Sequence, residues 1–182
     1  MKTIAVLVGS LRSGSFNLKL AKALEKLAEG RLKFVYPDLG SVPHYNDDLW
    51  SDLPASVTAL KSAIDESDAV LFVTPEYNRT YSPLLANAIA WASRPYGKSS
   101  FMHKPGAVVG TSPGAIGTAA GQVDLRGLLP VLGVIPMGQP EVYLQMKPDL
   151  IDDASNVTVP DTEAFLKRWV DAFVAFVDRV AL

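Results

Sequence analysis

The chain has 182 residues, a formal net charge of -2 and no cysteine. This length suits one domain with a substantial core, and the mild acidity gives no support to a nucleic-acid binder, which would show a basic patch. The absence of cysteine excludes a disulfide framework, a zinc-thiolate site and a thiol nucleophile. Any redox chemistry must therefore belong to a bound cofactor or metal.

No targeting or membrane segment is indicated by the apolar runs. The run at 4–8 is too short for the core of a signal peptide, and Arg12 follows it closely. No stretch approaches the ~20 apolar residues of a membrane helix. We therefore expect a cytoplasmic protein without membrane insertion.

Strand-like and helix-like patterns alternate along the chain, starting with the apolar run at 4–8 that ends in Gly9. Apolar runs of this kind are typical of parallel strands buried on both faces. The predicted strands span residues 4–8, 32–36, 69–74, 107–111 and 134–137. Helical spacing of apolar residues predicts helices over 17–29, 54–66, 82–93, 119–132 (broken near Pro130) and 162–180. Residues 37–54 and 138–160 are predicted to be irregular.

This alternation predicts an α/β fold with a parallel sheet covered by helices on both faces. Five strands fit the flavodoxin-like doubly wound order 2-1-3-4-5. No repeat, linker or low-complexity tract is present, so residues 1–182 are predicted to form a single domain.

Three polar loops follow the predicted first, third and fourth strands: "GSLRSGSFN" (9–17), "PEYNRTYSP" (75–83) and "TSPGAIGT" (111–118). Open α/β sheets bind ligands at the carboxyl ends of their strands, near the point where strand order reverses. These loops are therefore the predicted ligand site.

The first loop has the G-x-x-x-x-G spacing of a P-loop, but Ser15 stands where the lysine should be. NTP hydrolysis is thereby disfavoured. Serine hydroxyls, the Arg12 guanidinium, the Asn17 amide and backbone N–H groups suit one compact phosphate at a helix N-terminus. The alternative is a capped turn with a solvated arginine.

The second loop places an extended segment, Pro75 to Asn78, directly after a buried strand. Its backbone N–H and C=O groups are expected to be free, so they can pair with the edge of a flat heteroaromatic ring. Tyr77 or Tyr81 would pack beside that ring, or else serve packing or an oligomer contact.

Together, "GSLRSGSFN" and "PEYN…SPLLANAIAWASRP" resemble the NADPH-dependent FMN reductase family, which contains chromate, quinone and some azo reductases. The resemblance covers roughly residues 3–135. It implies a flavodoxin-like fold, non-covalent FMN, NADPH or NADH as electron donor, and a homodimer or homotetramer. It implies cofactor contacts from all three loops: Ser10, Arg12, Ser15, Phe16 and Asn17 around the phosphate, Pro75, Glu76, Tyr77 and Asn78 along the isoalloxazine, and Ser112 and Gly114 on the third side.

The chain departs from the family at Ala86 and Ala90, where members often carry lysine and aspartate. These positions lie past the flavin loop, so the departure concerns oligomer contacts or the substrate mouth. Glycines 114, 117 and 121 fit either close approach to a ligand or a flexible turn.

Flavin chemistry needs no catalytic side chain, because the cofactor's N5 carries the reaction. Glu76 is placed as a general acid or base, but we expect its backbone to matter more than its carboxylate. We interpret His44, Asp47 and Asp48 as part of a solvated acidic loop, and the tryptophans at 50, 91 and 169 as core or interface residues.

The predicted function is an NAD(P)H oxidoreductase that passes electrons through FMN to small-molecule acceptors: quinones, and further azo compounds, chromate or free flavin. A flavodoxin-type carrier without a substrate site is the alternative, although such carriers are usually strongly acidic. A second and weaker alternative is a flavin-free domain of the response-regulator kind. Such a domain needs an acidic cluster at its strand ends for Mg²⁺ and phosphorylation, whereas the first and third strands here end in Gly9 and Pro75.

Overall fold

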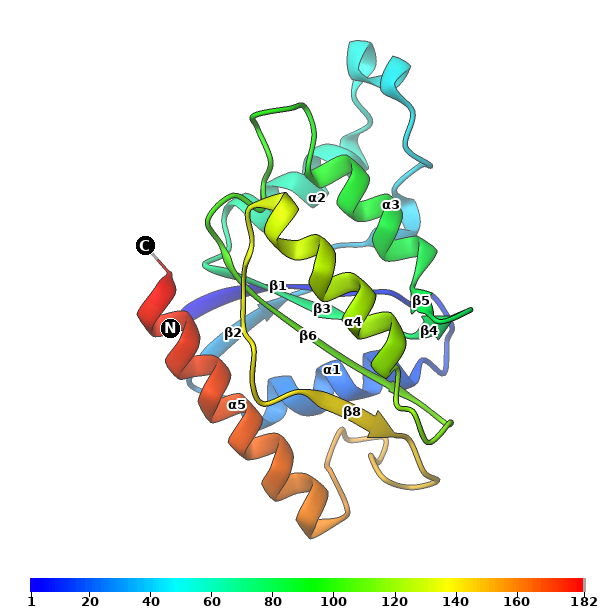
Figure 1. Ribbon diagram of the computed structural model, residues 1–182, viewed down its shortest axis with the longest axis vertical. Helices are drawn as coiled ribbons and strands as arrows, with labels where there is room; N and C mark the ends of the chain where they lie inside the picture. The colour runs from blue at the N-terminus through cyan, green and yellow to red at the C-terminus, as the bar shows by residue number, and fades with distance from the viewer. Residues whose placement is uncertain (182) are drawn as a thin grey trace.

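The computed structural model describes residues 1–181 and is built on one parallel sheet (Figure 1). Its strands run in the order β2-β1-β3-β6-β7, and β8 also pairs with β6. The main strands are β1 (Lys2–Val8), β2 (Leu32–Val35), β3 (Ala69–Val73), β6 (Pro105–Ser112), β7 (Ile135–Pro136) and β8 (Val142–Gln145). The flavodoxin-like order predicted from the sequence is confirmed.

Helices cover both faces of the sheet, because successive side chains of each strand point to opposite faces. Ile4 and Val6 face α1 and α5, whereas Ala5 and Leu7 face α2, α3 and α4. The helices are α1 (Phe16–Leu27), α2 (Ala55–Asp65), α3 (Pro83–Ala92), α4 (Ala119–Leu128) and α5 (Pro160–Val180). The break expected near Pro130 is confirmed, since a 3-10 turn, Leu129–Leu132, follows α4.

The fifth position of the sheet differs from the prediction, because two short strands share it. β7 pairs with the start of β6, at Pro105 and Gly106, and β8 pairs with its second half, from Val109 to Ser112. The prediction that 138–160 is irregular was therefore wrong for β8 and for the bridge between Ile151 and Val157. Proline cannot donate a ladder hydrogen bond, so Pro136 and Pro140 interrupt what would otherwise be one strand.

The remaining segments are short. Residues 37–54 contain two 3-10 turns, Leu39–Ser41 and Asp47–Asp52. β4 (Glu76–Tyr77) and β5 (Thr80–Tyr81) form a separate antiparallel hairpin between β3 and α3. Of the three tryptophans interpreted as core or interface residues, Trp91 and Trp169 are fully buried core residues, and Trp50 is partly buried and packs on Trp91.

Candidate active site

The first loop begins where β1 ends. The Gly9 N–H donates to the Val73 carbonyl of β3, and the chain then turns through exposed residues 11–14 into α1. Ser15 caps that helix, because its hydroxyl accepts the N–H of Leu18 at 3.1 Å. The first turn of α1 contains no acidic residue. Its unpaired N–H groups and positive dipole end therefore favour an anion at this point.

Arg12 supplies the cation of this loop. Its guanidinium lies 5.2 Å from the centroid of the Phe16 ring, over the face of that ring. Such a contact restricts the motion of an exposed arginine and leaves its N–H groups free for an anion. Phe16 therefore orients Arg12 at the start of α1.

Asn17 is buried and its amide is engaged within the protein. Its Nδ2 donates to the Thr111 carbonyl at 3.0 Å, and its Oδ1 accepts the Thr111 N–H at 3.1 Å. β3 and β6 are no longer paired at Thr111, because their last backbone hydrogen bond runs from the Thr74 N–H to the Val109 carbonyl. If β3 were longer, one of its peptide groups would bond the Thr111 N–H and C=O; the Asn17 side-chain amide takes that place. It thereby connects the first loop to the third.

The second loop is a tight hairpin rather than a single extended segment. Glu76 pairs with Tyr81 and Tyr77 with Thr80. Asn78 and Arg79 form its two-residue turn with φ values of 52° and 68°, as a type I′ turn requires. We expected the backbone N–H and C=O groups of 75–78 to be free. This was wrong for Glu76 and Tyr77 on the edge that pairs with β5. Tyr77 remains 50% exposed.

The Glu76 side chain makes structural contacts with both of its oxygens. One oxygen accepts the N–H of Gly121 at 3.0 Å, and the other lies 3.2 Å from the Arg79 guanidinium. The carboxylate thus connects the second loop to α4.

Ser82 joins the first loop to the second, and sequence reasoning missed it. Its hydroxyl donates to the Gly9 carbonyl at 2.7 Å and accepts the N–H of Leu84, while its own N–H donates to the Thr74 hydroxyl. A Cβ on Gly9 would lie 2.8 Å from the Ser82 Cβ, so the Ser82 side chain packs directly on the Gly9 backbone. The Ser82–Pro83 pair is a typical helix start, and this signal could have placed Ser82 at the site.

The third loop follows β6. The Ser112 hydroxyl donates to the Gly114 carbonyl at 3.2 Å, and a Cβ on Gly114 would lie 3.6 Å from that hydroxyl, which is an ordinary contact. By contrast, a Cβ on Gly117 would lie 2.5 Å from the Tyr143 backbone, and one on Gly121 would lie 2.9 Å from the Thr80 carbonyl oxygen. The absence of a side chain at Gly117 and Gly121 thus lets the backbone of Tyr143 and of Thr80 pack closely against them.

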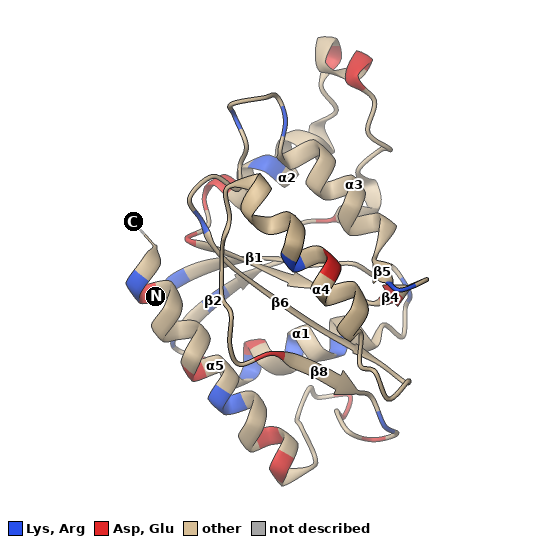
Figure 2. Cartoon of the chain, in the orientation of Figure 1, with Lys and Arg blue, Asp and Glu red and all other residues tan. Residues whose placement is uncertain are grey.

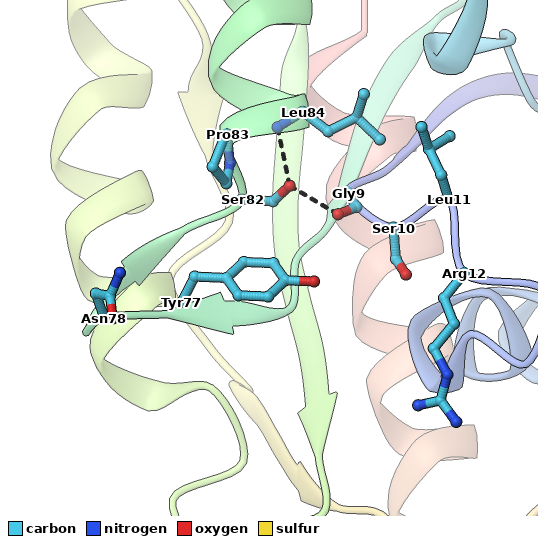
Figure 3. Close-up of a pocket in the computed structure, with 9 residues that line it drawn as sticks. All are labelled: Gly9, Ser10, Leu11, Arg12, Tyr77, Asn78, Ser82, Pro83 and Leu84. Carbon is cyan, nitrogen blue, oxygen red and sulfur yellow. Dashed lines mark hydrogen bonds between the residues drawn. The ribbon is translucent and has the colours of Figure 1, made fainter.

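A pocket of about 550 Å³ opens between the first loop and the hairpin (Figure 3). The Tyr77 ring extends across it toward Gly9 and Ser10, whereas Arg12 extends along the start of α1. The lining residues are Gly9, Ser10, Leu11, Arg12, Tyr77, Asn78, Ser82, Pro83 and Leu84.

Of the residues predicted from the sequence, Ser10, Arg12, Tyr77 and Asn78 line this pocket directly. The other predicted residues lie in the three loops but are not among those that line the pocket: Ser15, Phe16, Asn17, Pro75, Glu76, Ser112 and Gly114. The apolar wall of Leu11, Pro83 and Leu84 was not predicted, because isolated apolar residues at loop ends carry no sequence signal of their own.

Arg12 is the only charged residue among those that line the pocket. Within residues 1–181, no group of three or more histidine, aspartate or glutamate side chains is arranged to hold a metal. Across the same residues, no helix has the length and apolar character needed to span a membrane. The site therefore offers hydrogen-bond donors, one cation and an apolar wall.

Comparison with known proteins gives concordant matches over most of the chain. The family described as NADPH-dependent FMN reductase matches residues 2–149. The 2-hydroxy-1,4-benzoquinone reductase of a Burkholderia species is 46% identical over 174 residues, which cover 96% of this chain and 95% of that protein. A quinone reductase of Pseudomonas putida is 42% identical, with coverage of 96% and 94%.

A solved structure agrees along the full length. FerB, the flavoenzyme NAD(P)H:(acceptor) oxidoreductase of Paracoccus denitrificans, is 51% identical and superposes with a TM-score of 0.98. The match covers 100% of both chains.

Proposed function

This chain belongs to the NADPH-dependent FMN reductase family, and from that membership we propose that it is a quinone reductase that uses FMN and NAD(P)H. The observation that carries the proposal is the pocket between the first loop and the hairpin, with a capped helix N-terminus and Arg12 at one end and an apolar wall along its side.

The donor set fits FMN. A volume of about 550 Å³ lies within the range of cofactor pockets, and the lining contains no carboxylate that would repel a phosphate. The free N–H groups of α1 and the guanidinium of Arg12 are the partners that a terminal phosphate requires. Asn78 and the outward backbone edge of Glu76 and Tyr77 can bond the edge of a flat ring.

Each residue predicted from the sequence has a role in this proposal. Ser10, Arg12 and Ser15 would hold the phosphate, Phe16 would orient Arg12, and Asn17 would position the loop through Thr111 rather than touch the phosphate. Pro75, Glu76, Tyr77 and Asn78 would flank the ring, and Ser112 and Gly114 would close the third side. When bound, FMN supplies the redox chemistry, which is hydride uptake from a nicotinamide and electron delivery to an acceptor.

The pocket wall supports a flat, weakly polar acceptor. Leu11, Pro83, Leu84 and the exposed half of Tyr77 offer apolar surface on which a quinone ring can pack. The relatives named as quinone reductases point to the same class. Steady-state rates with NADPH and NADH against quinones, azo compounds, chromate and free flavin would rank both donors and acceptors.

Arg12→Ala tests the phosphate site. The variant should bind FMN at least about tenfold more weakly, because a charge-assisted contact to the phosphate is lost. Arg31→Ala is the matched control, since it removes the same charge from a surface ion pair with Asp171. Equal FMN affinity in all three proteins, measured by flavin fluorescence, would overturn the assignment.

We also propose a homodimer or homotetramer working in the cytoplasm, where NAD(P)H is supplied. α3 carries no charged residue (Figure 2). Ala86 on α3, Val123 on α4 and Val131 in the 3-10 turn that follows α4 are exposed. The departures at Ala86 and Ala90 thus contribute apolar surface to this face. Light scattering on the purified protein tests it, and a mass of 19.6 kDa would mean a monomer.

A further inference from the structure

Helix α4 receives its N-terminal cap from a distant part of the chain. Among residues 1–181, the Thr118 hydroxyl that precedes the helix bonds Gln122 and caps no backbone N–H. The N–H of Gly121, in the first turn, is accepted instead by the Glu76 carboxylate at 3.0 Å. A carboxylate at this end of a helix is favoured by both the free N–H groups and the helix dipole.

Two further contacts fix the hairpin to the same helix. The Thr80 hydroxyl on β5 donates to the Asp124 carboxylate on α4. Gly121 packs so closely on the Thr80 backbone that an added Cβ would lie 2.9 Å from its carbonyl oxygen. The hairpin that carries Tyr77 and Asn78 into the pocket therefore rests directly on the first turn of α4.

The Glu76 side chain is only 11% exposed, and both of its oxygens are engaged, one by Gly121 and one by Arg79. A carboxylate held in this way is poorly arranged to exchange protons with a substrate. Its geometry instead suits a group that holds two structural elements together.

We propose that Glu76 is a positioning residue of the quinone reductase, acting through Gly121 to dock the hairpin on α4 and so preform the cofactor pocket. The inference rests on the proposed function for the identity of the ligand, which is FMN. Because the same bond caps α4, undocking the hairpin also loosens the start of that helix. The pocket wall and the end of the third loop therefore open together. Only molecules with a docked hairpin bind FMN tightly, so the apparent affinity for FMN falls in proportion to the fraction that remains docked.

The first test removes and restores the acceptor oxygen. Glu76→Ala should raise the amide exchange rate of Gly121 in the flavin-free protein and weaken FMN binding by about tenfold or more. Glu76→Gln keeps an oxygen for the Gly121 N–H and should stay within about threefold of wild type, since only the charge assistance is lost. Arg79→Ala leaves the Gly121 bond in place and should behave like Glu76→Gln.

The second test displaces the hairpin without removing a hydrogen-bonding group. Gly121→Ala adds a methyl group against Thr80 and should weaken FMN binding to a similar degree. Gly127→Ala is the matched control on the same helix, because no described atom lies within 4 Å of its added Cβ. Alanine favours a helix over glycine, so a loss confined to Gly121→Ala cannot come from helix propensity.

The results separate this inference from the proposed function. Wild-type FMN affinity in Glu76→Ala and Gly121→Ala, with unchanged Gly121 exchange in Glu76→Ala, would overturn the positioning role and leave the flavoenzyme assignment intact. A wild-type protein that takes up no FMN would overturn the proposed function, while Gly121 exchange in Glu76→Ala would still decide whether Glu76 docks the hairpin. A thermal midpoint well above the assay temperature in every variant excludes simple unfolding as the cause.

Discussion

Replacing Asn17 with alanine removes both hydrogen bonds that join the first loop to β6. Asn17 is 4% exposed and Thr111 is 1% exposed, so the Thr111 N–H and C=O are left without partners and with little access to water. An unsatisfied buried group costs about 1–3 kcal/mol, so the two together predict a loss of about 2–6 kcal/mol in the free energy of unfolding. That is a large part of the ~5–15 kcal/mol that a domain of this kind possesses.

The assay is urea denaturation of the flavin-free protein, which keeps cofactor binding out of the comparison. Asn17→Asp is the informative second variant. Its carboxylate can still accept the Thr111 N–H, but its second oxygen faces the Thr111 carbonyl, so we expect it to be as unstable as Asn17→Ala at pH 7. Asn156→Ala is the control, because that side chain bonds only the Asp152 carboxylate on the surface and should cost less than about 0.5 kcal/mol. A loss below about 1 kcal/mol for Asn17→Ala, at an unchanged m value, would show that water replaces the amide and would refute this reasoning.

Two further predictions concern other parts of the fold. Burial alone would raise the pKa of Asp68, but the Thr3 N–H at 2.7 Å and Lys2 at 3.1 Å outweigh it and lower that pKa below the ordinary value of an aspartate. The ionised Asp68 therefore stabilises the fold fully above about pH 4, and this stabilisation fades as pH falls through the lowered pKa. The melting temperature of Asp68→Asn should lie below that of the wild type at pH 7, and the difference should shrink in acid. A difference that stays constant from pH 7 to pH 2 would contradict the assignment. The second prediction compares two fully buried tryptophans: Trp91 donates to the Pro43 carbonyl at 2.8 Å, whereas the Trp169 indole N–H has no partner among residues 1–181. Trp169→Phe should therefore cost about 1 kcal/mol less in unfolding free energy than Trp91→Phe, and equal losses by urea denaturation would count against it.

The fold was predictable from the sequence because its strands are continuous apolar runs. Residues 4–7 and 69–73 are buried, and short continuous apolar runs of this kind are typical of parallel strands covered on both faces. β8 was not predicted, because its four residues follow a turn with Gly138 and Pro140 and their pairing depends on the distant end of β6. Long-range pairing of a short segment leaves no local pattern to detect.

The candidate site was predictable only where residue type and loop position agree. Ser10, Arg12 and Ser15 are hydrogen-bond donors at a helix start, and that combination is visible in the sequence. The contacts of Ser82 and Glu76 were not visible, because each bonds a backbone group far along the chain: Gly9 for one and Gly121 for the other. A backbone partner has no side-chain signature, so only the folded chain identifies it.

Polar side chains join the first loop to each of the other two, and a further one joins the second loop to the helix that follows the third. Ser82 joins the first loop to the second, Asn17 joins the first to the third, and Glu76 joins the second to the start of α4. Burying a polar group costs free energy unless its hydrogen bonds are made, so each of these residues stabilises one arrangement of the loops and penalises the others. Such an arrangement suits a site whose cofactor carries the chemistry. The contribution left to the protein is the relative placement of three strand ends, and that placement is what these side chains fix.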